Sequence, residues 1–216
     1  SVLSVIFKES SVGHRVGVHV RSIGSGTVAA SEGDYIIAGD GGYRLCKERG
    51  IQPDLVVGDF DSLGYRPDHP NVRSFRPEKD FTDMHIAVKE GMALGYKHFV
   101  IFGGTGGRLS HTMANIQLLA ELASEGCEAV LMGTNSRIFV IHNSKISFEK
   151  EEEGYISVFS LSDRSEGVSL RGLKYLLEDA VLTNIFPLGA SNEFLGEVSE
   201  IEVRDGTLLI ITEKKF

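Results

Sequence analysis

Residues 56–62 carry two carboxylates, Asp59 and Asp61, directly after a short apolar run and a glycine. In an open α/β sheet, ligands bind beyond the carboxyl ends of the strands, where this pair would lie. Clustered carboxylates repel one another unless positive charge lies between them, and a hard divalent cation such as Mg²⁺, working with substrate phosphates, commonly supplies it. The alternative is that Asp59 caps a turn and Asp61 is merely exposed. The spacing favours a site for a metal and a phosphate.

Two further acidic segments strengthen this interpretation. Asp40 follows an apolar run on a tight Gly-Asp-Gly-Gly turn, and Asp80 lies with Lys79 just before a predicted helix. Helix capping by itself would account for Thr82 and Asp83 at the start of that helix. Capping does not account for Lys79 and Asp80 beside them. Several acids at the strand ends of one sheet edge therefore favour a metal-nucleotide site over scattered caps.

Four glycines fall within residues 103–107, between a predicted strand and a predicted helix. Bare backbone N–H groups and a helix N-terminus favour phosphate, and Arg108 adds a guanidinium that can bind phosphate through two hydrogen bonds. The segment is neither a Walker A loop nor a dinucleotide fingerprint, because its glycine spacing and flanking residues differ. A flexible turn is the alternative. His111 on the same helix start could be a structural histidine or part of the site.

The surrounding pattern divides the chain into two parts. Before about residue 132, short apolar runs alternate with helical patterns, as expected for a parallel sheet covered by helices. The predicted strands there are 35–38, 55–57, 99–102 and 129–132, and the predicted helices are 43–49, 84–95 and 110–126. After residue 135 the helical period disappears, and strands are predicted at 138–141, 155–159, 200–203 and 208–211. The acidic stretch 149–154 is interpreted as a solvated hairpin turn.

These patterns predict an α/β fold class: a Rossmann-like domain with a parallel sheet over residues 1–134, and an all-β sandwich domain over residues 135–216. The net charge of -8 argues against a nucleic-acid-binding protein with a broad basic surface. Cys46 and Cys127 are predicted to be reduced core residues. The sequence shows no signal peptide and no membrane-spanning run, so a cytoplasmic protein without membrane contact is expected.

Together these segments resemble the thiamine pyrophosphokinase family over nearly the whole chain from about residue 35. Residues 40–42, 58–62 and 79–83 look like that family's nucleotide and metal motifs, and residues 103–115 look like its Gly-Gly-Arg-x-x-His-x-x-x-Asn helix start. The Gly-Leu-Lys-Tyr, Ser-Asn and Gly-Thr-Leu-Leu blocks near the C-terminus look like its thiamine-side domain. Ser110 is a departure, because the family often has Asp at this position.

The resemblance implies transfer of a pyrophosphoryl group from ATP to the hydroxyl of thiamine, with Mg²⁺ as cofactor. It also implies a homodimer in which each active site lies between the α/β domain of one subunit and the sandwich of the other. The implied Mg²⁺ ligands are Asp59, Asp61 and Asp83, with Asp80 as a further catalytic acid. The implied ATP site comprises Asp40, Lys79, Thr82, Gly104, Arg108 and His111. Ser191 and Asn192 would face thiamine, although both are also ordinary turn formers.

Two alternatives belong to other classes. A metal-dependent phosphatase of the haloacid dehalogenase type uses the first Asp of an Asp-x-Asp pair as a nucleophile, but Ser62 and Leu63 do not continue its pattern. A non-catalytic sensor of a nucleotide or of thiamine would lack the acids that this sequence retains. Incubation with ATP, Mg²⁺ and thiamine distinguishes the three classes by their products.

Overall fold

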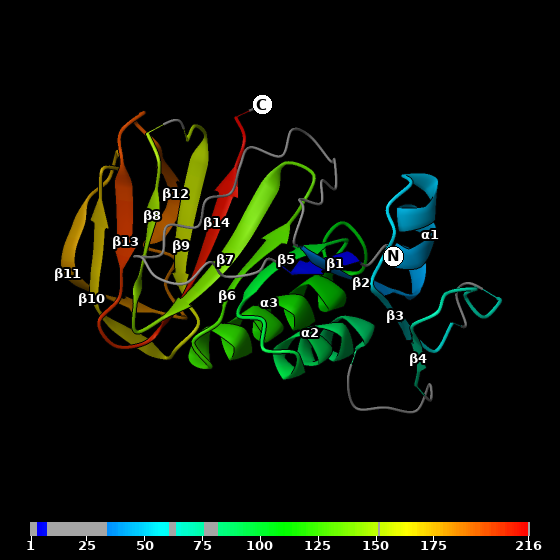
Figure 1. Cartoon of the computed structure of the whole chain (residues 1–216). Helices are drawn as coiled ribbons and strands as arrows, with labels where there is room; N and C mark the ends of the chain where they lie inside the picture. The colour runs from blue at the N-terminus through cyan, green and yellow to red at the C-terminus, as the bar shows by residue number, and fades with distance from the viewer. Residues whose placement is uncertain (1–3, 8–33, 61–63, 76–81, 151, 216) are drawn as a thin grey trace.

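The computed structural model describes residues 4–7, 34–60, 64–75, 82–150 and 152–215, which form mostly β-sheet with three helices (Figure 1). The helices are α1 (Asp40–Glu48), α2 (Asp83–Ala93) and α3 (Leu109–Ser124). The strands of the first half are β1 (Ser4–Phe7), β2 (Tyr35–Gly39), β3 (Leu55–Gly58), β4 (Val72–Ser74), β5 (His98–Phe102) and β6 (Glu128–Met132). Those of the second half are β7 (Ser136–His142), β8 (Lys145–Phe148), β9 (Tyr155–Ser160), β10 (Arg164–Arg171), β11 (Leu177–Thr183), β12 (Gly189–Glu193), β13 (Ser199–Glu202) and β14 (Thr207–Glu213).

The described strands form two sheets. The larger has ten strands in the order β12-β9-β14-β7-β6-β5-β1-β2-β3-β4, and the smaller has four in the order β11-β10-β13-β8. The pairs β2–β3, β3–β4 and β5–β6 are parallel, in agreement with the predicted parallel sheet. Strand β1 lies between β2 and β5 and is antiparallel to both, so the sheet is mixed rather than wholly parallel.

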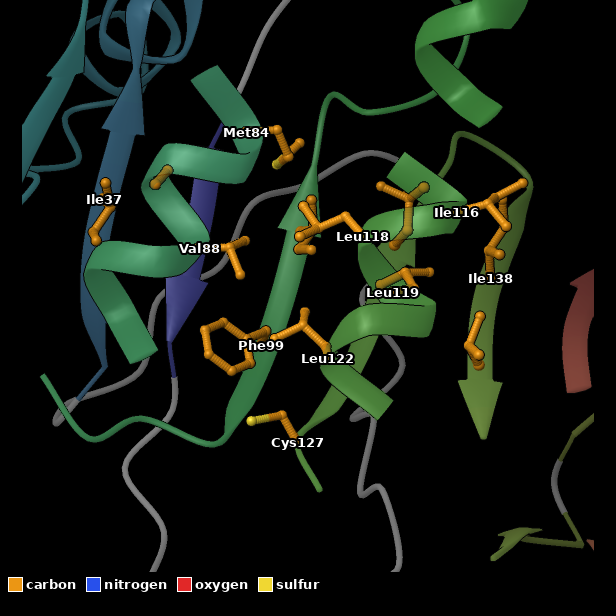
Figure 2. Close-up of a cluster of buried hydrophobic side chains, with 14 of the residues drawn as sticks. Ile37, Met84, Val88, Phe99, Ile116, Leu118, Leu119, Leu122, Cys127 and Ile138 are labelled. Carbon is orange, nitrogen blue, oxygen red and sulfur yellow. The ribbon is translucent and has the colours of Figure 1, made fainter. Parts of the chain in front are cut away.

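Helices cover both faces of the first half of the large sheet. Alternate residues of β2 and β3 face opposite sides, as the two-residue period of a strand requires. One face packs against α1 in a cluster that includes Ile36, Tyr43 and Val56. The other face packs against α2 and α3, and Figure 2 shows Val88 of α2 and Leu119 of α3 beside the strands of this face. The apolar residues that recur at helical spacing in the sequence thus form the buried faces of α2 and α3.

The second half consists of two packed sheets. Consecutive strands repeatedly change sheet: β7, β9, β12 and β14 belong to the large sheet, whereas β8, β10, β11 and β13 belong to the small one. One hydrophobic cluster joins the sheets, with Phe139 and Ile156 from the large sheet and Leu170 and Ile201 from the small one. The prediction of a hairpin at residues 149–154 is wrong, because β8 before this stretch and β9 after it lie in different sheets.

The two halves share the large sheet. β6 and β7 pair antiparallel, with Val130 opposite Phe139, so backbone hydrogen bonding continues from the helix-covered half into the β-rich half. Cys46 and Cys127 are both buried, as predicted for core thiols, and burial raises the pKa of Cys127. None of the described helices combines the length and the apolar character needed to span a membrane.

Candidate active site

The carboxyl ends of four strands in the first half lie at one edge of the large sheet. Gly39 of β2 pairs with Val57 of β3 in the parallel register, and Gly58 pairs with Ser74 of β4. Across β1, Ser4 is opposite both Ala38 of β2 and Phe102 of β5. The described residues directly after β2, β3 and β5 therefore lie on the same side of the sheet.

Asp59 follows β3 in a turn with unusual backbone geometry. Phe60, the next residue, has a φ of 63°, a left-handed conformation that costs a bulky residue about 1–3 kcal/mol. Its ring is buried in the cluster with Ile36 and Val56, which holds the backbone in this conformation. The Phe75 N–H also donates to the Gly58 carbonyl at 3.1 Å, which ties β4 to the same turn. Asp59 is thus fixed, half-buried, at the end of its strand.

The first turn of α2 brings a second acid to this edge. The Thr82 hydroxyl accepts a hydrogen bond from the His85 N–H at 3.2 Å, so the capping alternative is correct for Thr82. Asp83 lies in the first helical turn, where the helix dipole favours a carboxylate. Met84 reaches the glycine loop: a Cβ placed on Gly104 would lie 3.4 Å from the Met84 methyl carbon. The α2 start and the loop after β5 are therefore neighbours.

Gly104 lies where the loop after β5 packs closely against β6 and α3. A Cβ at this position would lie 2.5 Å from Leu131 Cδ1 and 2.8 Å from Asn115 Nδ2, so no larger residue fits without displacement. The Asn115 amide donates to the Gly104 carbonyl at 2.9 Å. The glycine at 104 is consequently required for packing, beyond any freedom that the loop needs.

Arg108 and His111 lie together at the start of α3. Arg108 is the N-cap residue, and both side chains are exposed. The Arg108 guanidinium contacts His111 Nε2 across the first turn. No side-chain capping bond from Arg108 covers the first N–H groups of α3, which leaves this helix start suited to an anion.

The remaining predicted acids are described only in part. Asp40 is the first residue of α1, directly after β2. Asp61, Lys79 and Asp80 lie outside the described residues. Among the described residues, no group of three or more His, Cys, Asp or Glu side chains is arranged to hold a metal ion. Asp59 and Asp83 supply two hard oxygen donors at the relevant edge, which is the donor chemistry that Mg²⁺ prefers.

In the β-rich half, the Gly-Leu-Lys-Tyr block at residues 172–175 is bonded to the block that holds Ser191 and Asn192, which lies in β12 rather than in a turn. Asn192 is 2% exposed, and its amide oxygen accepts from the N–H of Tyr175 at 2.9 Å. Its amide nitrogen donates to the Tyr175 carbonyl at 2.6 Å. Ser191 is exposed with a φ of 58°, and its N–H donates to Ser157 Oγ at 3.0 Å. Ser191 thus faces solvent, whereas the Asn192 side chain holds a neighbouring loop.

An ionic cluster borders the same loop. Glu193 accepts hydrogen bonds from Lys174 at 2.6 Å and from Lys215 at 2.8 Å. These two hydrogen bonds lower the pKa of Glu193 to about 2. The Lys174 ammonium also lies 5.5 Å from the centroid of the Tyr175 ring. The cluster joins the residues after β14, the strand β12 and the loop that carries Tyr175.

Sequence reasoning assigned no role to two residues of these sites. Asn115 is buried on α3, and its signal was a polar residue within the apolar stripe of a helix. Tyr175 belongs to the Gly-Leu-Lys-Tyr block, and the residue is 59% exposed beside the cluster. The left-handed backbone of Phe60 has no signal in the sequence, because glycine is the residue normally expected there.

Comparison with known proteins is consistent with this arrangement. The family description "Thiamin pyrophosphokinase, catalytic domain" matches residues 28–131, and "Thiamin pyrophosphokinase, vitamin B1 binding domain" matches residues 143–208. The chain is 29% identical over 179 residues to the thiamine pyrophosphokinase of Bacillus subtilis, which covers 80% of this chain and 84% of that protein.

Solved structures show the same likeness. The crystal structure of thiamine pyrophosphokinase from Bacillus subtilis superposes with a TM-score of 0.75 at 28% identity, covering 83% of this chain and 87% of that one. The thiamin pyrophosphokinase from Geobacillus thermodenitrificans gives a TM-score of 0.72 at 26% identity, with 83% and 86% covered. The two family matches together span most of the sequence. The chain therefore belongs to the thiamin pyrophosphokinase family.

Proposed function

We propose that this enzyme forms thiamine diphosphate and AMP from thiamine and ATP at the carboxyl edge of its large sheet. The proposed location is supported by the positions of Asp59, the Asp83 helix start and the Gly104 loop along that one edge. The three segments come from different parts of the chain, and each offers chemistry that a metal-bound polyphosphate requires.

Mg²⁺ is the proposed cofactor. Asp59 and Asp83 supply oxygen donors, and Asp61 completes the proposed set by the family resemblance. When bound, the ion would supply positive charge that offsets the phosphates and the charge that develops during transfer. Asp80 and Lys79 are proposed at the same site on the resemblance alone.

The protein's own groups hold the nucleotide and orient the reaction. The start of α3 presents backbone N–H groups, and Arg108 presents a guanidinium suited to a phosphate in two-point contact. His111 contacts Arg108 and fixes the direction of its guanidinium. Asp40 at the start of α1 and Thr82 at the start of α2 complete the proposed ATP side. The thiamine hydroxyl attacks the β-phosphorus, AMP leaves, and Asp80 or Asp83 accepts the hydroxyl proton.

Thiamine is proposed to bind to the β-rich half. In this proposal, residues 1–134 form a Rossmann-like catalytic domain and residues 135–216 form a β-sandwich that holds the vitamin. Exposed Ser191 is suited to contact the substrate directly. The Asn192 amide is hydrogen-bonded to the Tyr175 backbone, so Asn192 would act on thiamine binding indirectly, by holding the loop that carries Tyr175.

A homodimer with active sites between subunits is proposed on the resemblance and on surface chemistry. Large apolar side chains are exposed in the segment between β11 and β12, where Ile185 is 88% exposed and Phe186 and Leu188 are also exposed. A monomer rarely leaves such side chains together in water, and a second copy would cover them. We place the enzyme in the cytoplasm, with no nucleic-acid or membrane partner.

The test is a product assay on the purified full chain with ATP, Mg²⁺ and thiamine. Thiamine diphosphate and AMP in equal amounts are expected. Free phosphate without thiamine diphosphate would indicate a phosphatase, and binding without turnover would indicate a sensor. Size-exclusion chromatography with light scattering tests the proposed dimer. A mass of one chain at the concentrations used in the assay would contradict it.

A further inference from the structure

Asn115 is a polar residue on the buried side of α3. It is 7% exposed, and its helix neighbours Ile116, Leu119 and Leu122 belong to the core cluster between α3 and the sheet. A buried amide without hydrogen-bond partners destabilises a fold, so the stability of this position depends on what the Asn115 amide contacts. The partner is the Gly104 carbonyl, which accepts from Asn115 Nδ2 at 2.9 Å.

Gly104 is the residue at which the glycine loop is held in place. Gly103 and Gly106 have φ values of 74° and 81°, a region that glycine enters without strain. Gly104 instead is buried, and the space for a Cβ is filled by Leu131 of β6 and by Asn115 itself. One peptide of the loop is thus held from β6 and from α3.

We propose that Asn115 is a positioning residue for ATP: by holding the Gly104 carbonyl, it sets the direction in which the loop amides face the triphosphate. This inference rests on the proposed function, in which the loop binds phosphate. Asn115 itself does not touch the nucleotide, because its side chain is buried. It lies seven residues after Arg108, which places it roughly 10 Å further along the helix axis.

The hydrogen bond also holds the glycine loop beside the start of α2. Gly104 lies beside the Met84 side chain, and Met84 follows Asp83 in the first turn of α2. Displacement of the Gly104 peptide would therefore move the phosphate-facing amides relative to the Asp83 carboxylate. The geometry predicts an effect on ATP and no comparable effect on thiamine, whose proposed binding surface is in the other half.

The decisive variant is Asn115→Asp, which keeps the size of the side chain and replaces the donor with an oxygen. Steady-state kinetics with each substrate varied in turn should show a roughly tenfold higher KM for ATP and a KM for thiamine within about twofold of the unchanged enzyme. Calorimetric titration with ATP and Mg²⁺ in the absence of thiamine should show a similar loss of affinity. Gln117→Glu is the matched control, because it makes the same amide-to-acid change on an exposed position of the same helix.

Gly104→Ala tests the same contact from the loop side and should give the same ATP-selective defect, even if Asn115→Asp does not fold. Ile116→Val is the control for lost stability, since it trims a buried neighbour without changing a hydrogen bond. Unchanged ATP affinity in both Asn115→Asp and Gly104→Ala would overturn the proposal. An equal rise in the KM for ATP and the KM for thiamine that Ile116→Val also shows would overturn it as well. If the unaltered enzyme forms no thiamine diphosphate, the proposed function fails, while ATP calorimetry still decides the role of Asn115.

Discussion

The side chain of Asn192 holds the backbone of Tyr175 at both ends: its oxygen accepts from the Tyr175 N–H, and its nitrogen donates to the Tyr175 carbonyl. A side-chain amide here replaces the backbone pairing of a neighbouring strand. The adjacent bridge between Leu173 and Phe194 continues the same contact. The loop that presents the exposed Tyr175 ring is therefore fixed to β12.

This relationship predicts that Asn192→Ala raises the KM for thiamine and leaves the KM for ATP nearly unchanged. The change leaves two Tyr175 backbone groups without their partner, which costs on the order of 1–3 kcal/mol each where they stay buried. We expect a several-fold rise in the KM for thiamine and a lower melting temperature. An unchanged KM for thiamine would show that the loop does not serve the substrate.

A direct binding measurement complements the kinetics. The sequence contains no tryptophan, so Tyr175→Trp introduces a single fluorescent reporter into the loop. Thiamine should change its emission in a saturable manner, and adding Asn192→Ala should weaken the response. Leu94→Trp, exposed at the end of α2, is the control that should not respond.

The Asp59 carboxylate is expected to be essential for turnover. Asp59→Asn keeps the shape of the side chain but removes the charge that a divalent ion and phosphates require, so activity should fall roughly a thousandfold or more. The melting temperature should change little, because the turn is held by the buried Phe60 ring. Asp68→Asn, an exposed carboxylate in the same half, is the control. Near-normal activity of Asp59→Asn would remove this residue from the proposed metal site.

Much of the helix-covered half was predictable because its strands are buried on both faces. Such strands have short apolar sequences. β2 and β5 were predicted to begin at residues 35 and 99, and each begins within one residue of that position. The helices α2 and α3 likewise follow their apolar stripes. The position of β1 was not predictable, because four residues give no sign that they insert antiparallel between two parallel strands.

The site was predictable where chemistry is local and not where it depends on contacts. Acids at strand ends and a glycine-rich loop can be recognised from the sequence itself. In the structure, Asp59 lies at the same edge of the sheet as the loop after β5. The burial of Asn192 and the contact of Asn115 with Gly104 depend on segments that meet only in the folded chain. The change of sheet between β8 and β9 is of the same kind, and an acidic turn signal could not reveal it.

The planar geometry of Arg108 is expected to matter beyond its charge. Arg108→Lys keeps one positive charge but loses the two-point contact with phosphate and the contact with His111. We expect roughly a ten- to hundredfold loss in kcat/KM for ATP, measured by AMP release. Arg164→Lys in the β-rich half makes the same exchange at an exposed ion pair and should have little effect. Equal activity of the two variants would contradict the role given to Arg108.

The Glu193 cluster predicts a dependence of stability on acid pH. Hydrogen bonds from Lys174 and Lys215 lower the pKa of Glu193 from an ordinary 4.5 to about 2, so the folded chain favours the ionised carboxylate. Its contribution to stability is complete above pH 4.5 and is lost as the pH falls toward 2. Thermal unfolding of the unaltered chain and of Glu193→Gln should therefore show a gap in melting temperature above pH 4.5 that closes in acid. Glu197→Gln removes an exposed carboxylate nearby and should show no such closing gap, whereas a Glu193→Gln gap that is independent of pH would contradict the ionic origin of the effect.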